Sequence, residues 1–193
     1  MRLRVGVLGS TRGTALQAVI DAIESSELDI EIVLVVSNRE SAPILDRAAK
    51  YGVKTLYVSA AGLSREEFDR RVSVALCEHR AELVLMIGYM RIVSIEFVSA
   101  WRGRLLNVHP SLLPAFSGLM NEKVHEAVLE SGVKETGCTI HLVTEEVDAG
   151  PVVLQKRCPV LPSDTVEILK QRVQALEREA FVEVLKNWGR TCH

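Results

Sequence analysis

Short apolar runs alternate with helical patterns along the first half of the chain, and this alternation limits the possible folds more than any other feature. Residues 2–8, 30–36, 54–58 and 83–87 have the pattern of strands, and the segments between them carry apolar residues at helical spacing. The run 83–87 is continuously apolar, which is typical of a parallel strand buried on both faces. The sequence therefore predicts an α/β fold with a Rossmann-like, doubly wound sheet flanked by helices.

The second half of the chain extends this sheet. Residues 105–109 predict a further strand, and residues 136–144 and 152–157 predict two strands joined by the acidic loop Glu145–Pro151. We expect about seven strands in all, mostly parallel, with an antiparallel C-terminal pair. No linker or repeat interrupts the pattern, so we expect a single domain over residues 1–189 and a short tail over 190–193.

Capping signals and apolar spacing predict the helices. Ser64 and Glu67 form a capping-box pattern that opens a helix to about Arg80. A closing helix is predicted to begin near Asp164, with Glu167 three residues later. The other predicted helices begin at Thr14 and cover residues 42–51 and 122–131.

The first strand leads through a glycine loop into the first helix. Gly9–Thr14 has neither the Gly-Lys-Ser/Thr of a Walker loop nor the G-x-G-x-x-G spacing of a dinucleotide site. Its N–H groups and the helix N-terminus can hold an anion, with Ser10, Thr11, Arg12 and Thr14 as further donors. We expect a monophosphate here, although a tight strand-to-helix turn without a ligand would have the same pattern.

Two polar residues end the strand 105–109. Because side chains alternate along a strand, Leu105, Asn107 and His109 share one face, while Leu106 and Val108 share the other. The following proline cannot donate to a strand ladder, so the strand stops after His109. In an open α/β sheet the carboxyl ends of the strands carry the ligand site. The sequence predicts a reaction centre at this edge.

Composition excludes several classes of protein. The 193 residues have a formal net charge of −2, which gives no electrostatic basis for binding nucleic acid or an anionic membrane. No apolar run is long enough to span a membrane. The four cysteines are widely separated, so we expect free thiols in the cytoplasm and no structural zinc. We expect no metal ion, and either a monomer or a homodimer.

Four segments together resemble a known family. Gly9–Gln17, Gly88–Ile92, Leu105–Pro114 and Val147–Pro151 are similar, in order, to the motifs of the formyltransferases that use 10-formyltetrahydrofolate. The similarity extends over nearly the whole chain. Among family members it is greatest to those that formylate glycinamide ribonucleotide in purine synthesis. The resemblance implies formyl transfer from the folate co-substrate to the amine of that nucleotide.

The resemblance also implies roles for individual residues. Asn107, His109 and Asp148 are the implied catalytic residues, and an ionised Asp148 would be expected to raise the pKa of His109. The implied nucleotide-binding residues are Arg12, Gly13, Thr14, Ala15, Gln174 and Glu177. The implied folate-binding residues are Arg65, Met90, Arg91, Ile92, Val93 and Asn107. The resemblance implies no role for His125 and His141; a place near the pocket is one alternative for both, and we expect both to be structural.

Some positions depart from the family pattern. Ala15 stands where many relatives carry Asn or Asp, so one side-chain contact to the substrate is absent. Ser117 stands where proline is common, and the segment Met120–Lys123 is slightly longer than in some relatives.

Three other kinds of protein would have a similar sequence. Formyltetrahydrofolate deformylases direct water at the same formyl group but carry an N-terminal regulatory domain, whereas methionyl-tRNA formyltransferases add a C-terminal RNA-binding domain. We expect neither, because the first strand starts at residue 2 and the chain has no basic surplus. A non-catalytic binding module on the same scaffold is a further alternative, and the combination of Asn107, His109 and Asp148 argues against it.

Overall fold

The computed structural model describes residues 2–120 and 122–188, and in this part of the chain it forms one seven-stranded sheet. The strands are β1 (Leu3–Leu8), β2 (Ile30–Ser37), β3 (Thr55–Tyr57), β4 (Leu83–Met86), β5 (Leu105–His109), β6 (Glu135–Leu142) and β7 (Val152–Pro159). Their order is β3-β2-β1-β4-β5-β6-β7. Strands β1 to β5 are parallel, and β6 and β7 are each antiparallel to the preceding strand. The predicted sheet is confirmed.

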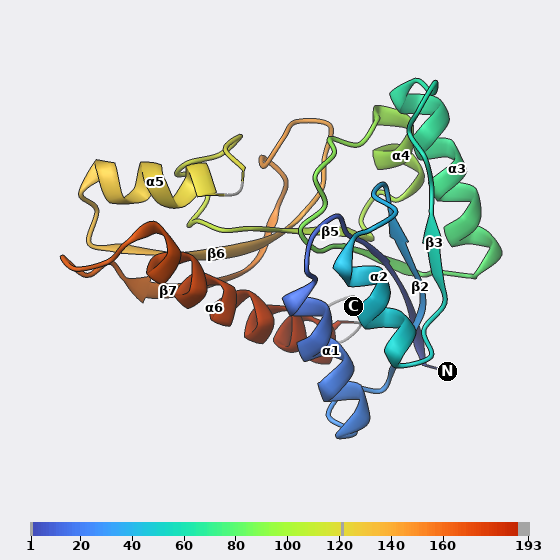
Figure 1. The fold of residues 1–193 in the computed structure, drawn as a ribbon, viewed down its shortest axis with the longest axis horizontal. Helices are drawn as coiled ribbons and strands as arrows, with labels where there is room; N and C mark the ends of the chain where they lie inside the picture. The colour runs from blue at the N-terminus through green and yellow to red at the C-terminus, as the bar shows by residue number, and fades with distance from the viewer. Residues whose placement is uncertain (1, 121, 189–193) are drawn as a thin grey trace.

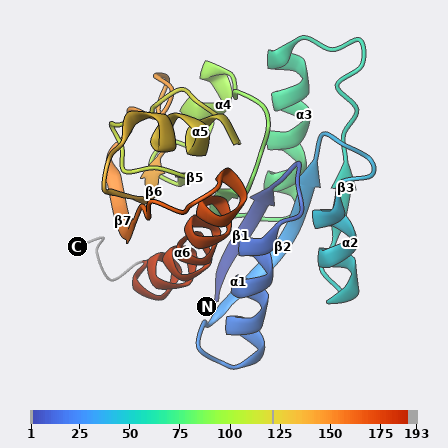
Figure 2. The same ribbon diagram turned by 60° about the vertical axis from the view of Figure 1, so that its left-hand side comes forward.

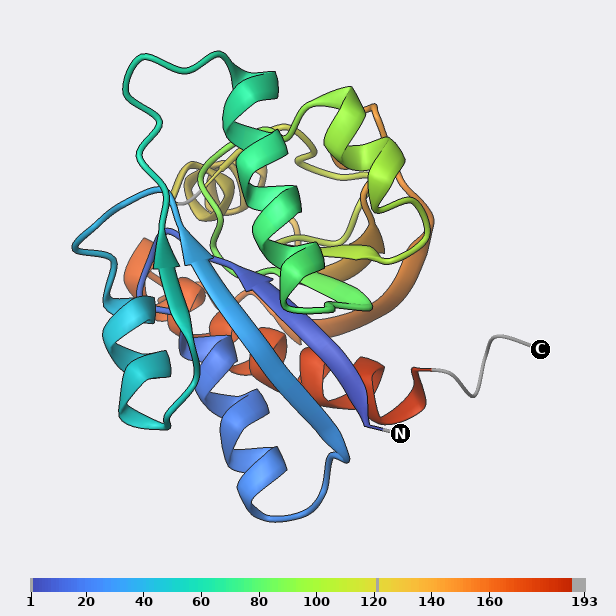
Figure 3. The ribbon, with the colours of Figure 1, turned by 90° about the vertical axis from the view of Figure 1, so that its right-hand side faces the viewer.

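Six helices are present in the described residues and cover both faces of the sheet (Figure 1). They are α1 (Thr14–Glu24), α2 (Pro43–Lys50), α3 (Arg65–Glu78), α4 (Ile95–Ala100), α5 (Glu122–Ser131) and α6 (Val166–Asn187). Figure 2 shows α1 and α6 side by side across one face. In Figure 3, α3 lies on one side of β1–β3, and α1 and α2 lie on the other.

Two apolar clusters hold these layers together, and they confirm the predicted faces of β5. Leu106 packs in the cluster that contains Leu16 of α1 and Phe181 of α6. Leu105 packs in the cluster on the opposite face, with Phe68 of α3. Burying these side chains on both faces removes apolar surface from water along the whole strand, which fixes its register. Asn107 and His109 then follow Leu105 on the same face.

Local capping explains where two helices begin. The hydroxyl of Ser64 accepts the N–H of Glu67 at 3.1 Å, and the Glu67 carboxylate accepts the N–H of Ser64 at 2.9 Å, so the predicted capping box is confirmed. Helix α6 was predicted to begin near Asp164, and it begins at Val166. Thr165 is its N-cap, while Asp164 forms an ion pair with Arg172 instead.

Some features were not predicted or lie outside the described residues. The short helix α4 was missed, although Ser94 caps it by accepting the N–H of Phe97. Cys77, Cys138 and Cys158 are free thiols, as expected. Cys192, residue 189 and the predicted tail 190–193 lie outside the described residues. Among the described helices, none combines the length and apolar character that crossing a membrane requires.

The strand order also locates the site. β1 has β2 on one side and β4 on the other, so the chain winds away from β1 in both directions. The carboxyl ends of β1 and β4 therefore meet where the winding reverses, and in open α/β sheets a ligand crevice forms at such a point. In this chain the loops there touch, because the N–H of Ser10 donates to the carbonyl of Gly88 at 3.1 Å.

Candidate active site

A cavity of about 810 Å³ opens at this edge of the sheet. Its walls come from the loops after β1 and β4, the end of β5, the loop between β6 and β7, and helices α5 and α6. Of the residues to which the family resemblance assigns a role, the structure brings all but Arg65 to this cavity. Those that line it are Arg12, Gly13, Thr14, Ala15, Met90, Arg91, Ile92, Val93, Asn107, His109, Asp148, Gln174 and Glu177.

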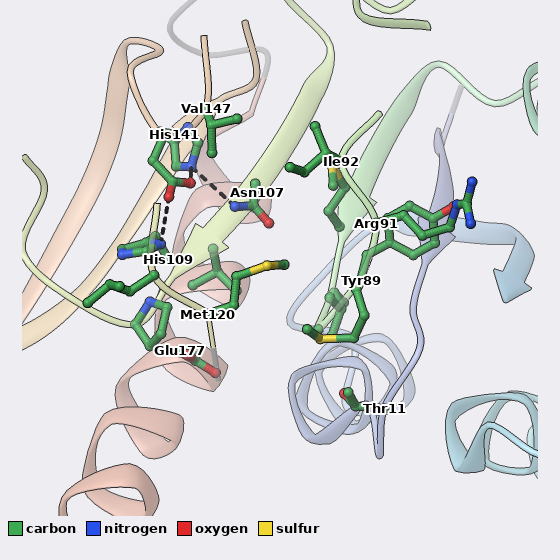
Figure 4. Close-up of a pocket in the computed structure, with 18 of the residues that line it drawn as sticks. Thr11, Tyr89, Arg91, Ile92, Asn107, His109, Met120, His141, Val147 and Glu177 are labelled. Atoms are coloured by element: carbon green, nitrogen blue, oxygen red, sulfur yellow. Dashed lines mark hydrogen bonds and ion pairs between the residues drawn. The ribbon is translucent and has the colours of Figure 1, made fainter. Parts of the chain in front are cut away.

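His109 belongs to a polar group that lines this cavity (Figure 4). Its Nδ1 is 3.2 Å from Oδ2 of Asp148, and its Nε2 is 3.1 Å from the carbonyl oxygen of Phe116. The ring is only 3% exposed. Both ring nitrogens thus face oxygen acceptors, and the carboxylate is the stronger one. We infer that Nδ1 keeps its proton toward Asp148, which leaves Nε2 as the nitrogen that can accept a second proton.

Both partners of His109 lie in strained backbone. Asp148 has φ 55° and Phe116 has φ 62°, and positive φ values are uncommon for residues other than glycine. Such strain is maintained only where surrounding contacts determine the conformation, and it concentrates at functional sites. One such contact joins the two loops, because the N–H of Gly118 donates to Oδ2 of Asp148 at 2.9 Å.

Asp148 raises the pKa of His109, as expected, but the net shift is downward. Burial is the largest influence on the ring, and it lowers the pKa of His109 below its ordinary value. Asp148 and the Phe116 carbonyl act in the opposite direction, but they do not outweigh burial. The neutral form of His109 therefore dominates near pH 7, and a neutral imidazole can accept a proton.

Asp148 stays ionised in spite of its position. Burial is the largest influence on its carboxyl group and raises the pKa. The nearby His141, the hydrogen bond from the N–H of Gly118 and the nearby His109 nevertheless leave the pKa of Asp148 below its ordinary value. The site therefore holds a neutral base beside a negative charge.

His141 belongs to this polar group, contrary to the expectation that it is only structural. It lies opposite Asn107 in the β5–β6 ladder. Its Nε2 is 3.3 Å from Nδ2 of Asn107 and 3.6 Å from Oδ1 of Asp148, and its Nδ1 is 2.9 Å from the Leu142 carbonyl. Among the described residues, Asn107 makes no other side-chain hydrogen bond. One N–H of its amide is thus available to a ligand.

The glycine loop presents the N-terminus of α1 to the cavity. Gly13 is the N-cap of α1, with φ 63°, and the first turn contains no acidic residue. Free N–H groups and the helix dipole at this point favour an anion. Ala15 is 2% exposed and its side chain packs in the core, so it offers only backbone to a ligand.

The suggestion that Ser10 supplies a donor to an anion is wrong. Its hydroxyl donates to Oδ1 of Asn38 at 2.6 Å and accepts the N–H of Met90 at 3.0 Å. Ser10 is buried and ties the loop after β1 to the segment after β4. Ser10 therefore does not line the cavity, but it holds together the two segments that do.

The segment after β4 forms a second wall, of mixed apolar and cationic character. The guanidinium of Arg91 lies over the ring of Phe68, 4.2 Å from its centroid. Asp69, 1% exposed, accepts the N–H of Ser94 at 2.5 Å and so anchors the end of this wall to α3. Arg65 does not line the cavity; it is exposed at the first position of α3.

Helices α5 and α6 form the third wall. Glu177 lies at the floor of the cavity (Figure 4), and burial raises its pKa to about 7. It can therefore both donate and accept hydrogen bonds near neutral pH. Facing it, α5 contributes His125, which is 3% exposed. Burial, with the nearby charge of Lys170, lowers the pKa of His125 to about 4, so this ring is neutral.

The described residues show no group of three or more His, Cys, Asp or Glu side chains that could hold a metal ion. The chemistry available at the cavity is proton transfer at His109, hydrogen bonding at Asn107, and anion binding at the N-terminus of α1.

Known proteins share this fold and sequence. The sequence profile of the formyl transferase family matches residues 3–185. The chain is 39% identical to the phosphoribosylglycinamide formyltransferase of Escherichia coli, covering 95% of this chain and 85% of that one. The crystal structure of glycinamide ribonucleotide transformylase 1 from Symbiobacterium toebii has a TM-score of 0.93 and 41% identity, covering 98% of this chain and 88% of that chain.

Longer proteins also contain a matching region. The chain is 46% identical to part of the trifunctional purine biosynthetic protein adenosine-3 of Drosophila pseudoobscura pseudoobscura, over 95% of this chain. It spans only 14% of that relative's length. The match over residues 3–185 and the bacterial relative of similar length together identify the family. The chain belongs to the formyl transferase family.

Proposed function

We propose that this protein transfers the formyl group of 10-formyltetrahydrofolate to the amine of glycinamide ribonucleotide. The products are N-formylglycinamide ribonucleotide and tetrahydrofolate, in purine synthesis. The observation that carries this proposal is that Asn107, His109 and Asp148 line one cavity, with Nδ1 of His109 3.2 Å from Oδ2 of Asp148. The names of the bacterial relatives support the choice of acceptor. The location proposed for the protein is the cytoplasm, as the sequence predicts.

The proposed chemistry needs a hydrogen-bond donor and a proton acceptor at one point. The amine of the nucleotide attacks the formyl carbon, and a tetrahedral intermediate forms with negative charge on the formyl oxygen. The free N–H of Asn107 donates to that oxygen, where charge develops in the transition state. His109 accepts the proton that the attacking nitrogen loses, and Asp148 stabilises the imidazolium so formed. Collapse of the intermediate expels N10 of the folate, which takes up the proton that His109 accepted.

The proposed binding modes follow the walls of the cavity. The phosphate binds at the N-terminus of α1 beside Gly13, Thr14 and the Ala15 N–H, with Arg12 nearby. Gln174 and Glu177 bind the ribose and glycinamide part of the nucleotide. The folate lies against Met90–Val93 with Asn107 at its reacting end, and Arg65 at the rim pairs with its glutamate tail.

A spectrophotometric assay of folate turnover, with and without glycinamide ribonucleotide, tests this function. We expect turnover only in the presence of the nucleotide, and none in a His109→Ala variant that keeps the circular dichroism spectrum of the parent. Turnover without the nucleotide would instead make water the acceptor and the protein a deformylase. If correctly folded protein turns over no folate under either condition, the proposed function is wrong.

A further inference from the structure

Lys170 lies in the α6 wall of the cavity, and none of the roles proposed above uses it. It precedes Gln174 by one helical turn and Glu177 by two, so the three side chains form one stripe along the helix. Its Nζ is 2.8 Å from Oε1 of Glu122 on α5 and 3.5 Å from Oε2 of Glu167. The hydrogen bond to Glu122 is the largest influence on the Lys170 ammonium and raises its pKa, so the group is charged.

Lys170 lines the same cavity as Arg12 of the anion site and His109 of the reaction centre. The charges on Lys170 and on Arg12 of the glycine loop both lower the pKa of Glu167, in the first turn of α6. The charges of Lys170 and His109 both lower the pKa of His125. A substrate with its anion at the start of α1 and its amine at His109 would occupy the cavity that Lys170 lines.

A buried polar atom beside Lys170 also lacks a partner. The Nδ1 of His125 is buried and makes no hydrogen bond within residues 2–120 and 122–188. Leaving such an atom unpaired costs free energy, so most buried polar groups in proteins have a partner. His125 lines the cavity, where a hydroxyl or phosphate oxygen of a ligand could pair with it.

We propose that Lys170 is a substrate-binding residue that contacts the phosphate of the nucleotide, and that Glu122 competes with this phosphate for the Lys170 ammonium. The proposal rests on the function proposed above. A dianionic phosphate is a stronger partner for an ammonium group than one carboxylate. In the free protein Glu122 pairs the charge of Lys170, and the phosphate displaces it on binding.

The two partners of this ion pair should therefore have opposite effects on affinity. Lys170→Gln removes a charge-assisted contact and should raise the Kd for glycinamide ribonucleotide about tenfold. Glu122→Gln removes the competitor and should lower this Kd about two- to fivefold, the range expected for a partly exposed ion pair. If the pair served only to hold α5 against α6, both substitutions would act in the same direction.

Isothermal titration calorimetry of the full chain with glycinamide ribonucleotide, without folate, measures these constants. Lys170→Arg should recover most of the affinity because it keeps the charge. The ion pair of Lys186 and Glu27, at the other end of α6, supplies matched controls. We expect Lys186→Gln and Glu27→Gln to leave the Kd unchanged, and thermal unfolding confirms that each variant folds.

The results separate this inference from the proposed function. Equal constants for the parent and Lys170→Gln, or a rise in Kd for both Lys170→Gln and Glu122→Gln, would overturn the role of Lys170. If the parent binds the nucleotide but transfers no formyl group, the proposed function fails, while the constants still decide the role of Lys170. If the parent does not bind the nucleotide at all, both proposals are wrong.

Discussion

Replacing Asp148 by Asn removes the carboxylate from the centre of the site while keeping its shape. Asp148 faces Nδ1 of His109 at 3.2 Å and Nε2 of His141 at 3.6 Å. A hydrogen bond to a charged group contributes about 1.5–3 kcal/mol, but the second distance is longer than a normal hydrogen bond. One full interaction and a weak one amount to about 2–3 kcal/mol, so we expect kcat/KM to fall about 30- to 160-fold.

The same variant should change the pH dependence in a defined direction. Transfer needs neutral His109, so the activity of the parent falls as the pH drops through the pKa of His109, which burial holds below its ordinary value. Asp148 acts against burial, and its removal lowers the pKa of His109 further. The acidic limb of the kcat/KM profile should therefore move to lower pH in Asp148→Asn.

Steady-state kinetics of the parent and the variant across the acidic range measure both effects. Asp46→Asn serves as the control, because Asp46 is an exposed aspartate on α2 away from the cavity. An acidic limb that stays in place or moves to higher pH would refute the argued interaction of Asp148 with His109. A loss of activity within threefold would show that the carboxylate contributes little to the transition state.

Three further predictions follow from individual contacts. Asn107→Ala should lower kcat about 10²- to 10³-fold in the folate assay, the loss typical of one oxyanion donor, and a change confined to KM would contradict this role. Gly13→Ala should lower the free energy of unfolding in urea by about 2 kcal/mol or more, because Gly13 has φ 63° and an added Cβ would collide with Ile44. Gly52→Ala, with φ 70° but open space around it, should cost less than Gly13→Ala, and equal losses would exclude the collision. Arg65→Gln should raise the KM for a folate with a glutamate tail and leave unchanged the KM for a folate that lacks it. Equal changes in the two KM values would show that Arg65 does not bind the glutamate tail.

Local sequence signals predicted the parts of the structure that local interactions determine. The capping box at Ser64 involves residues three apart, so it is visible in the sequence. The faces of β5 follow from the alternation of side chains, which held from Leu105 to His109. Helix α4 was missed because its six residues are too few to establish a helical period, although its cap at Ser94 was present.

Features that depend on distant segments were not predictable in the same way. His141 reaches Asn107 through the register of the β5–β6 ladder, and the sequence of β6 alone does not give that register. The alternation of residues along 136–144 was the available signal, but it does not reveal the partner strand. The pKa of His109 depends on how deeply the fold buries the ring. The hydroxyl of Ser10 turned inward because Asn38 and Met90 are adjacent to it only in the folded chain.

The fate of the formyl carbon tests the central claim most directly. The measurement is mass spectrometry of a single turnover, with 10-formyltetrahydrofolate labelled by ¹³C in the formyl group and excess glycinamide ribonucleotide. We predict that the label appears on the nucleotide with the parent protein, and on neither nucleotide nor formate with His109→Ala. Label recovered as formate from the parent would show transfer to water. Labelled nucleotide formed at the parent rate by His109→Ala would contradict the proposed mechanism.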